Sequence, residues 1–170
     1  KVGDLAYTME RKERGVFETT IKGDLENQEY NYLIRHHKSF HETLDPYAYA
    51  SNANSKSNIV IDVDQINESL YLEKLPHMKR KTDAIIYELS VRDFTMSSSI
   101  KASHPGTFMS LVEENLKTPK GNKAGFDYLV DLGITHIQIM PMYDFATVDE
   151  LHPTVMYNWG YDPIQYNVPE

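Results

Sequence analysis

The stretch GFDYLVDLGITHIQIMP, residues 125–141, indicates the fold of the second half of the chain. The apolar positions of its first part have helical spacing: Phe126, Leu129 and Val130. Gly133 follows them where a helix C-terminus favours glycine. Residues 134–141, ITHIQIMP, then predict a strand that ends at a proline. Residues 84–91 form an apolar run that suits a strand buried on both faces. Strand, helix and strand in this order predict a βαβ unit with parallel strands and a right-handed crossover.

The segment between these two runs carries another helix signal. Thr107 is suited to cap a helix over residues 108–117, whose apolar positions again have helical spacing. Pro119 and Gly121 follow and should end that helix. We therefore expect two helices between residues 104 and 133.

A long loop, residues 141–170, is expected after the second strand, and it contains YNWGYDP, residues 157–163. Aromatic faces stack on the apolar faces of sugar rings, and short amide and carboxylate side chains bond sugar hydroxyls. In a βα barrel, the loop after a strand lies on the face that carries the active site. The candidate sugar-binding residues are Tyr157, Asn158, Trp159, Tyr161 and Asp162. Composition alone is equally typical of a packed aromatic loop, so both interpretations stay open.

The first 62 residues are rich in β-branched and aromatic residues. Residues 16–21 and 30–34 predict the two strands of a hairpin, and residues 59–63 predict a further strand. An immunoglobulin-like sandwich needs about seven strands, so these residues supply only part of one. Residues 63–82 are polar and predict a linker.

Several of these stretches resemble type I pullulanases and related α-1,6-glucan debranching enzymes of the α-amylase superfamily. YNWGYDP, continued by IQYNVPE, resembles a signature of these enzymes. DAIIYELSVRDFT, residues 83–95, resembles their first barrel strand, and residues 125–145 resemble the end of the first helix and the second strand. Residues 15–34 and 43–62 resemble the end of the carbohydrate-binding module that precedes the barrel. The resemblance covers nearly the whole chain.

The resemblance implies an α+β fragment with parts of two domains. Residues 1–62 correspond to the C-terminal part of an immunoglobulin-like β-sandwich carbohydrate-binding module. Residues 63–82 correspond to a linker. Residues 83–170 correspond to the first βαβ portion of a (β/α)8 TIM barrel. Barrels of this kind take about 250 residues, so the expected portion is an opening piece.

The resemblance also implies roles for the loop residues. Tyr161 matches the tyrosine that stacks on the sugar next to the scissile bond, and Asp162 matches a carboxylate that supports this subsite. Asn158 and Trp159 match residues that shape the subsite, and Tyr157 lies at its edge. The implied partners are α-glucans: pullulan, starch or glycogen.

Catalytic residues are not expected in this chain. Retaining glycosidases use two carboxylates, which in this superfamily follow the fourth and fifth barrel strands. The chain should end before the third strand, so we expect the parent enzyme to hydrolyse α-1,6 linkages with retention and this chain alone to be inactive. Glu88, Asp93 and Asp144 flank the predicted strands; we expect Glu88 to be a strand residue and the other two to bond loop backbone. The alternative is a non-catalytic α-glucan-binding protein.

Composition excludes several other classes of function. The chain has 170 residues and a net charge of −8, which argues against nucleic-acid binding. It contains no cysteine, which excludes disulfides, zinc-thiolate sites and cysteine catalysis, and which slightly favours the cytoplasm. No apolar run approaches a membrane span. His36, His37 and His41 are interpreted as solvated residues, no cofactor is expected, and the sequence leaves a calcium requirement open. Exposed sheet edges in an incomplete barrel should favour self-association.

Overall fold

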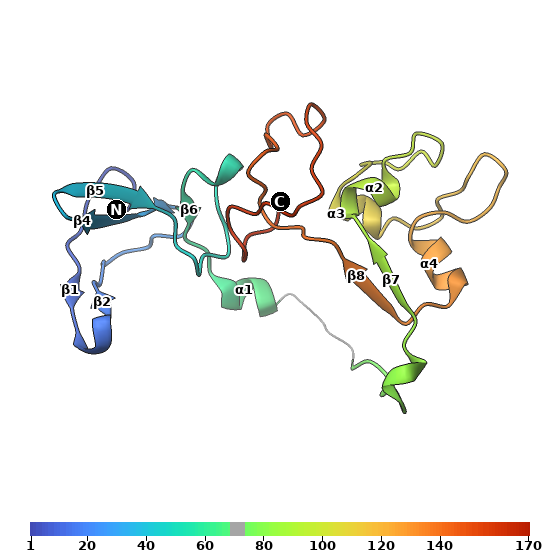
Figure 1. Cartoon of the computed structure of the whole chain (residues 1–170), viewed down its shortest axis with the longest axis horizontal. Coiled ribbons are helices and arrows are strands. Elements are labelled where there is room, and N and C mark those ends of the chain that lie inside the picture. The colour runs from blue at the N-terminus through green and yellow to red at the C-terminus, as the bar shows by residue number, and fades with distance from the viewer. Residues whose placement is uncertain (69–73) are drawn as a thin grey trace. The chain divides into compact units, whose positions relative to one another are not determined.

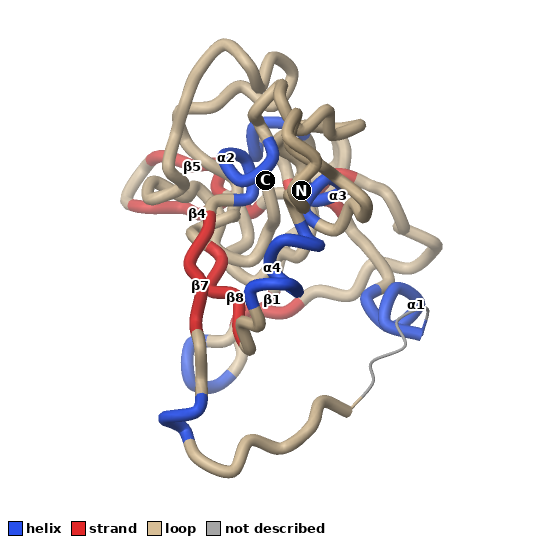
Figure 2. Tube along the Cα trace, turned by 90° about the vertical axis from the view of Figure 1, so that its right-hand side faces the viewer, coloured by secondary structure: helices blue, strands red, loops and turns tan. Residues whose placement is uncertain are grey.

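The computed structural model describes residues 1–68 and 74–170, and these divide into two compact units. The first unit comprises Lys1–Leu72, Tyr143–Asn158 and Asp162–Glu170, and the second comprises Glu73–Met142 and Trp159–Tyr161. Figure 1 labels the helices and strands along the chain. Figure 2 shows that much of the trace lies in loops and turns outside them.

The strands of the first unit form antiparallel pairs. The pairs are β1 (Glu10–Arg11) with β2 (Phe17–Glu18), β3 (Glu29–Tyr30) with β6 (Asn58–Ile59), and β4 (Tyr32–His36) with β5 (Ser39–Thr43). Short 3₁₀ turns occur at η1 (Glu13–Gly15) and η2 (Ala53–Ser55), and α1 (Val63–Glu68) follows the last strand. The strands are short and paired two by two, which fits a part of a sandwich better than a closed one.

The predicted hairpin between residues 16–21 and 30–34 is wrong. The second of these runs instead contributes to β4, and a turn of only two residues separates β4 from its partner β5. The intervening turn places His37 at φ +54°, in the left-handed region. A turn this short costs less closure entropy than the longer loop of the predicted hairpin, and this explains why the local pairing wins.

The end of the first unit also differs from expectation. Of the strand predicted over residues 59–63, only Ile59 lies in a strand, because β6 covers Asn58 and Ile59 and α1 begins at Val63. The Asp62 carboxylate accepts hydrogen bonds from the backbone N–H groups of Asp64 (3.0 Å) and Gln65 (3.1 Å). These bonds satisfy N–H groups that have no partner within the helix, so Asp62 caps α1.

The second unit contains the predicted parallel strand pair. It comprises η3 (Lys81–Asp83), β7 (Ile86–Leu89), α2 (Val91–Thr95), α3 (Phe108–Leu111), α4 (Phe126–Leu132) and β8 (His136–Ile139). β7 pairs with β8 in parallel, from Ile86 opposite His136 to Leu89 opposite Ile139. This pairing confirms the strand, helix, strand order, although α3 is much shorter than the predicted helix over residues 108–117.

Local capping signals were correct at two helix ends. Thr107 caps α3 in a capping box with Ser110. Gly133 ends α4 at φ +73°, a left-handed conformation that costs glycine little. By contrast, α2 was not predicted; Ser90 caps it by accepting a hydrogen bond from the Asp93 N–H at 3.3 Å.

Three leucines form the core of the second unit. Leu89, Leu111 and Leu129 are 4%, 8% and 2% exposed, and they come from β7, α3 and α4. The remaining members of the cluster are partly buried: Tyr87, Val91, Phe94, Ile134 and Ile139. The elements β7, α2, α3, α4 and β8 thus each contribute apolar side chains to one small cluster.

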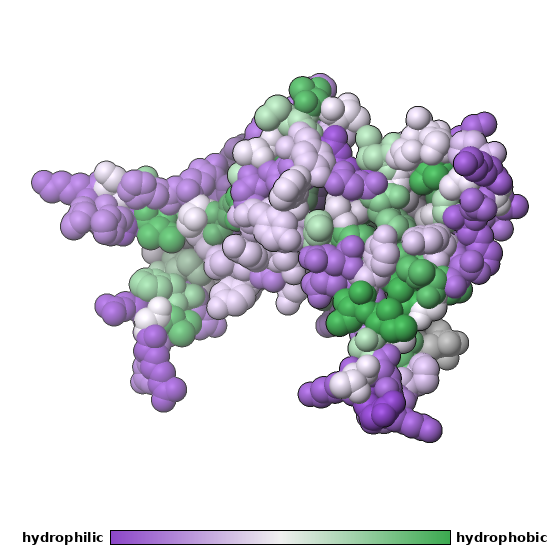
Figure 3. Space-filling model, turned by 45° about the vertical axis from the view of Figure 1, so that its right-hand side comes forward, coloured by the Kyte–Doolittle hydropathy of each residue, from purple (hydrophilic) through white to green (hydrophobic). Residues whose placement is uncertain are grey.

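The expectation that residues 84–91 form a strand buried on both faces is wrong for this structure. Ile85 and Ile86 are 55% and 65% exposed, whereas Leu89 is buried. Figure 3 shows such exposed apolar side chains gathered in patches on the surface. The core cluster covers the inner side of β7, and no element of the described chain buries these two isoleucines. No helix among the described residues is long and apolar enough to cross a membrane.

Two tyrosines of the first unit should ionise at a higher pH than a free tyrosine. The Asp45 carboxylate accepts hydrogen bonds from the hydroxyls of Tyr30 (2.8 Å) and Tyr32 (3.2 Å). Burial, followed by the hydrogen bond and charge of Asp45, raises the pKa of Tyr30 above its usual value, and burial and the Asp45 charge also raise the pKa of Tyr32. The unfolded phenol ionises near pH 10, so the stability that this site contributes is present below about pH 10 and is lost as pH rises further.

We therefore expect a tyrosine fraction that stays protonated above about pH 10 in the folded chain and ionises on unfolding. Phenolate absorbance at 295 nm, titrated with and without urea, measures this fraction. Tyr30→Phe should reduce it, whereas Tyr47→Phe, which alters a ring that is 81% exposed, should not. Identical titration curves for the folded and unfolded chain would contradict the expectation.

Candidate functional site

The two limbs of the loop over residues 141–170 pair with each other. Isolated antiparallel bridges join Tyr143 to Pro169 and Phe145 to Pro163. Backbone N–H groups donate from Asp144 to the Val168 carbonyl (3.0 Å) and from Ile164 to the Asp144 carbonyl (2.8 Å). The predicted irregular loop therefore has a defined base, where its two limbs are hydrogen-bonded to each other. This pairing fixes which residues form the tip of the loop.

Asn158 and Asp162, two of the predicted sugar-binding residues, bond to the same side chain of the first limb. The Asn158 amide donates to the Thr147 hydroxyl and to Asp162 Oδ1. The Thr147 hydroxyl donates to Asp162 Oδ2 at 3.1 Å, and the Ala146 N–H donates to the Asp162 carbonyl at 3.0 Å. These bonds occupy both Asp162 carboxylate oxygens, so here Asn158 and Asp162 clamp the limbs together.

The three aromatic candidates differ from this pair because they are exposed. Tyr157, Trp159 and Tyr161 are 53%, 67% and 63% exposed. Between the last two lies Gly160, which is buried and has φ +86°, a value that most side chains disfavour. Trp159 and Tyr161, on either side of the bend at Gly160, thus present aromatic rings to solvent, which suits stacking on a flat ligand.

A buried amide network holds this loop to residues 45–58 within the first unit. Asn58 and Gln165 are 0% and 4% exposed, and the Asn58 amide donates to Gln165 Oε1 at 3.0 Å. The Gln165 amide donates to the Asp45 carbonyl (3.0 Å), and the Asp45 N–H donates to Asn58 Oδ1 (2.6 Å). Sequence reasoning missed this network because asparagine in a serine-rich and asparagine-rich stretch only indicates irregular structure.

A cluster of carboxylates is the second feature that the sequence did not reveal. One oxygen each of Asp144, Glu150 and Glu170 lies within 4.8 Å of the others. Asp144 is 1% exposed and accepts a hydrogen bond from the Ser55 hydroxyl, so the expectation that its carboxylate bonds loop backbone is wrong. Ser55 lies close enough to make this bond only because the loop folds back onto the N-terminal residues.

Glu170 has a strongly perturbed carboxyl group. Burial raises its pKa to about 7, and the negative charges of Glu150, Asp144 and Asp162 act in the same direction. The Phe145 N–H, which donates to Glu170 Oε2 at 2.8 Å, opposes the shift. Burial and the nearby negative charges thus both destabilise the ionised form of the Glu170 carboxyl group.

The other titratable candidates belong to other elements of the chain. Glu88 lies in β7, as expected, and Asp93 lies in α2; both belong to the second unit. His36 and His37 stack edge to face at 4.3 Å, and His41 lies in β5. Among the described residues, the acidic cluster is the group with ligand atoms close enough for a metal, and it includes no histidine.

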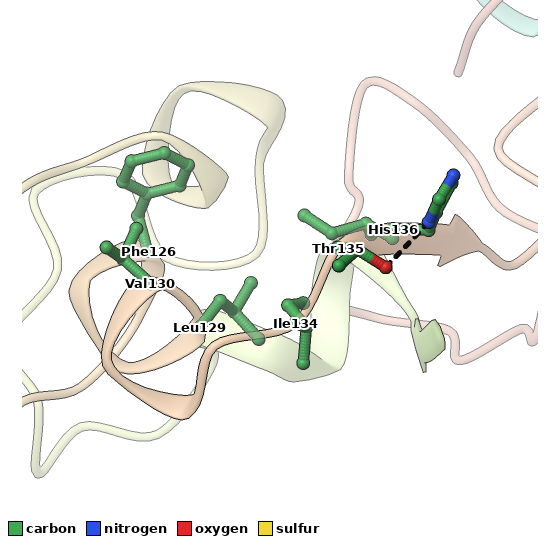
Figure 4. Close-up of a pocket in the computed structure, with 7 residues that line it drawn as sticks. Phe126, Leu129, Val130, Ile134, Thr135 and His136 are labelled. Carbon is green, nitrogen blue, oxygen red and sulfur yellow. Dashed lines mark hydrogen bonds between the residues drawn. The ribbon is translucent and has the colours of Figure 1, made fainter. Parts of the chain in front are cut away.

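A hollow also lies beside α4. Phe126, Leu129 and Val130 line it from α4, and residues 134–137 line it from the other side. Figure 4 shows Leu129 next to Ile134, with the Thr135 hydroxyl bonded to His136 Nδ1 at 2.8 Å. The lining is mostly apolar and overlaps the core cluster, which indicates an uncovered packing surface and not a catalytic pocket.

Comparison with known proteins supports the resemblance seen in the sequence. Residues 4–48 match the carbohydrate-binding module 48 family, described as the isoamylase N-terminal domain. A pullulanase of Bacillus subtilis is 36% identical over 164 residues, which are 96% of this chain and 22% of that enzyme. A chloroplastic isoamylase of Zea mays is 31% identical over 96 residues, which are 56% of this chain and 11% of that protein.

Solved structures agree with these sequence matches. The crystal structure of a pullulanase from Anoxybacillus sp. LM18-11, complexed with maltotriose, matches with a TM-score of 0.91 at 36% identity. The match covers 96% of this chain and 23% of that chain, so this chain spans between a fifth and a quarter of the length of such relatives. A type I pullulanase from Bacillus subtilis, complexed with maltose, matches with a TM-score of 0.88. The chain is therefore a relative of the type I pullulanases along nearly its whole length, and its residues 4–48 match the carbohydrate-binding module 48 family.

Proposed function

We propose that this chain is part of a debranching enzyme that hydrolyses α-1,6-glucosidic linkages in pullulan, starch or glycogen with retention of configuration. The loop over residues 141–170 binds the glucan in this proposal. The observation that carries it is the display of Trp159 and Tyr161 on either side of the buried Gly160. The pullulanase relatives, two of which were crystallised with maltotriose or maltose, support the choice of an α-glucan as ligand.

Within the loop, the proposed roles divide between the clamp and the rings. Tyr161 stacks on the sugar at the scissile bond, Trp159 shapes the subsite beside it, and Tyr157 forms its edge. Asn158 and Asp162 support the subsite by bonding to each other and to Thr147. A clamp that fixes two limbs limits the entropy lost when the rings become ordered on a ligand, so it favours binding.

The domain organisation is also part of the proposal. Residues 1–62 form the C-terminal part of the module, residues 63–82 connect it, and residues 83–170 open the barrel. The parallel pairing of β7 and β8 supports the barrel assignment because parallel neighbours joined through a helix are its repeating unit. The catalytic carboxylates are assigned to no residue of this chain, and the self-association expected from exposed residues such as Ile85 and Ile86 stays a prediction.

A non-catalytic α-glucan-binding protein is the second candidate, and the match of residues 4–48 to a carbohydrate-binding module favours it. The coding sequence downstream of Glu170 distinguishes the two candidates. Further barrel strands followed by two carboxylates would support the enzyme, because glycoside hydrolysis needs both groups. A stop codon directly after Glu170 would support the binding protein.

Binding can be measured directly because Trp159 is the single tryptophan of the chain. We expect maltotriose to change the intrinsic fluorescence of the chain in a saturable way, since a stacked sugar replaces water at the indole. Tyr161→Ala should weaken this binding about tenfold, consistent with aromatic stacking worth about 1–3 kcal/mol on flat ligands. Val155→Ala, at a 74% exposed apolar position of the same loop, is the matched control and should leave the affinity unchanged. A fluorescence response that Tyr161→Ala leaves unaltered would refute the stacking role, and the absence of any saturable response would refute glucan binding by this loop.

A further inference from the structure

The turn over residues 45–48 leaves a large aromatic ring in solvent. Asp45 Oδ1 accepts a hydrogen bond from the Tyr47 N–H at 2.9 Å, and the Asp45 carbonyl accepts one from the Ala48 N–H at 3.1 Å. An aspartate that bonds the backbone two residues on is typical of a tight turn. Ala48 is 4% exposed, whereas Tyr47 is 81% exposed. The turn therefore buries its small apolar side chain and presents its large one.

Partners from several other segments hold this turn in place. The Asp45 carboxylate also accepts hydrogen bonds from the hydroxyls of Tyr30 in β3 (2.8 Å) and Tyr32 in β4 (3.2 Å). The Asp45 N–H donates to Asn58 Oδ1 in β6 at 2.6 Å. The Gln165 amide, in the loop over residues 141–170, donates to the Asp45 carbonyl at 3.0 Å. The backbone that carries Tyr47 is thus fixed by four other segments of the first unit.

A second exposed ring is carried by a segment that is bonded to this turn. The Asn167 amide donates to the Pro46 carbonyl at 3.0 Å. Pro46 directly precedes Tyr47, and Asn167 directly follows Tyr166, so this bond ties together the two segments that carry the tyrosines. Tyr166 is 68% exposed, and its ring packs against that of Tyr143 with the centroids 6.1 Å apart. Tyr166 is therefore held in place while most of its surface stays in solvent.

Two rings held in this way differ from the scattered apolar residues of an ordinary protein surface. Single exposed aromatic side chains are common and need no explanation. Here the two segments that carry the rings are also joined by buried amides, because Asn58 donates to Gln165 and the two residues are 0% and 4% exposed. Fixing the backbone beneath an exposed ring lowers the entropy lost when a ligand binds, which favours binding.

The chemistry of this surface points to a neutral ligand with many hydroxyl groups. Tyrosine combines a flat apolar face with a hydroxyl that both donates and accepts. The exposed Asn167 adds a side-chain carbonyl, which is an acceptor for a ligand hydroxyl. The Asp45 carboxylate already accepts three hydrogen bonds within the unit, so its charge does not call for a cation. Sugar rings, with apolar C–H faces and hydroxyl edges, fit such a surface.

We propose that Tyr47 and Tyr166 form a second binding site for a linear α-glucan chain, in addition to the site at Tyr161. The choice of an α-glucan rests on the proposed function, and the residues that match the carbohydrate-binding module, 4–48, include Tyr47. Two rings on bonded segments suit a chain of several glucose units better than a single sugar, because each ring stacks on one unit.

Calorimetric titration with maltohexaose tests the second site separately from the first. The 170-residue chain is used with Trp159→Ala and Tyr161→Ala together, which removes the two rings on which the loop site depends. We expect this double variant to retain saturable binding. Adding Tyr47→Ala should weaken the remaining binding at least about tenfold, as expected for the loss of a stacked ring. Tyr47→Phe keeps the ring and should retain most of the affinity.

Phe40→Ala in the same background is the matched control, because Phe40 of β5 is 68% exposed, as Tyr166 is, and lies in the same unit. It should leave the affinity unchanged. Tyr166→Ala should weaken binding as Tyr47→Ala does. If losing the contact with Tyr143 lowers its melting temperature, Tyr47→Ala decides the outcome, since the Tyr47 ring is 81% exposed and its N–H is retained in alanine.

The possible outcomes separate this site from the loop site. If the double variant shows no saturable binding up to about 10 mM maltohexaose, or if Tyr47→Ala and Phe40→Ala bind alike, the second site is wrong. Binding by the parent chain that the double variant loses would leave the loop site standing alone. If the double variant instead binds as the parent does and Tyr47→Ala abolishes this binding, the second site is supported and glucan binding at Tyr161 is refuted.

Discussion

Replacing Tyr161 with alanine, in a full-length pullulanase that carries this segment, should lower kcat/KM on pullulan about tenfold to a hundredfold. The ring is 63% exposed beside the buried Gly160, so it is open to solvent and is not part of a packed core. Stacking of a ring on a flat ligand is worth about 1–3 kcal/mol, and each 1.4 kcal/mol corresponds to about a factor of ten.

The loss should appear in kcat as well as in KM. Glycoside hydrolysis passes through an oxocarbenium-like transition state that gathers positive charge, and the face of an aromatic ring favours that charge over the neutral ground state. An interaction that is stronger in the transition state contributes to kcat. Tyr161→Phe retains the ring and should keep most of the activity.

Thermal unfolding provides the control for this experiment. If Tyr161→Ala melts at the parental temperature and keeps the parental kcat/KM, then the tyrosine only packs the loop. If Tyr161→Ala instead lowers the melting temperature and Tyr161→Phe restores it, the ring supports the structure and the activity loss does not report stacking. A normal melt with a reduced kcat identifies a substrate contact.

The second large effect concerns stability. Leu129→Ala should destabilise the second unit by about 2–5 kcal/mol, the usual cost of truncating a buried leucine. Leu129 is 2% exposed and packs in one cluster with Leu89 and Leu111. Because this cluster is small, few other apolar contacts compensate for the cavity that alanine would leave.

Urea unfolding followed by circular dichroism measures the difference. Val130→Ala, one residue along the same helix, is the matched control because Val130 is 63% exposed. Its expected effect is within about 0.5 kcal/mol, as for most surface substitutions. Equal losses of stability in the two variants would show that the cluster around Leu129 is not the core of this unit.

The sequence by itself determined the local framework of the second unit. The apolar periodicity of residues 125–141, the capping residue Thr107 and the terminal Gly133 correctly indicated helices and the parallel pair β7 and β8. These signals are readable because each arises from residues a few positions apart, within one turn of helix or along one strand. The motif of residues 157–163 was equally local, so the aromatic residues and the bend at Gly160 could be identified without the structure.

Only the tertiary structure decided which distant segments meet. β3 pairs with β6, and β4 pairs with β5 instead of with the strand that the sequence suggested. Within the first unit, a hydrogen bond joins Asn58 to Gln165, although the two residues are more than a hundred positions apart. The same folding gathers Asp144, Glu150 and Glu170 into one cluster. Such contacts between polar residues leave no periodic pattern in the chain, because their partners are set by how the backbone closes and by which buried groups must be satisfied, and not by neighbours in sequence.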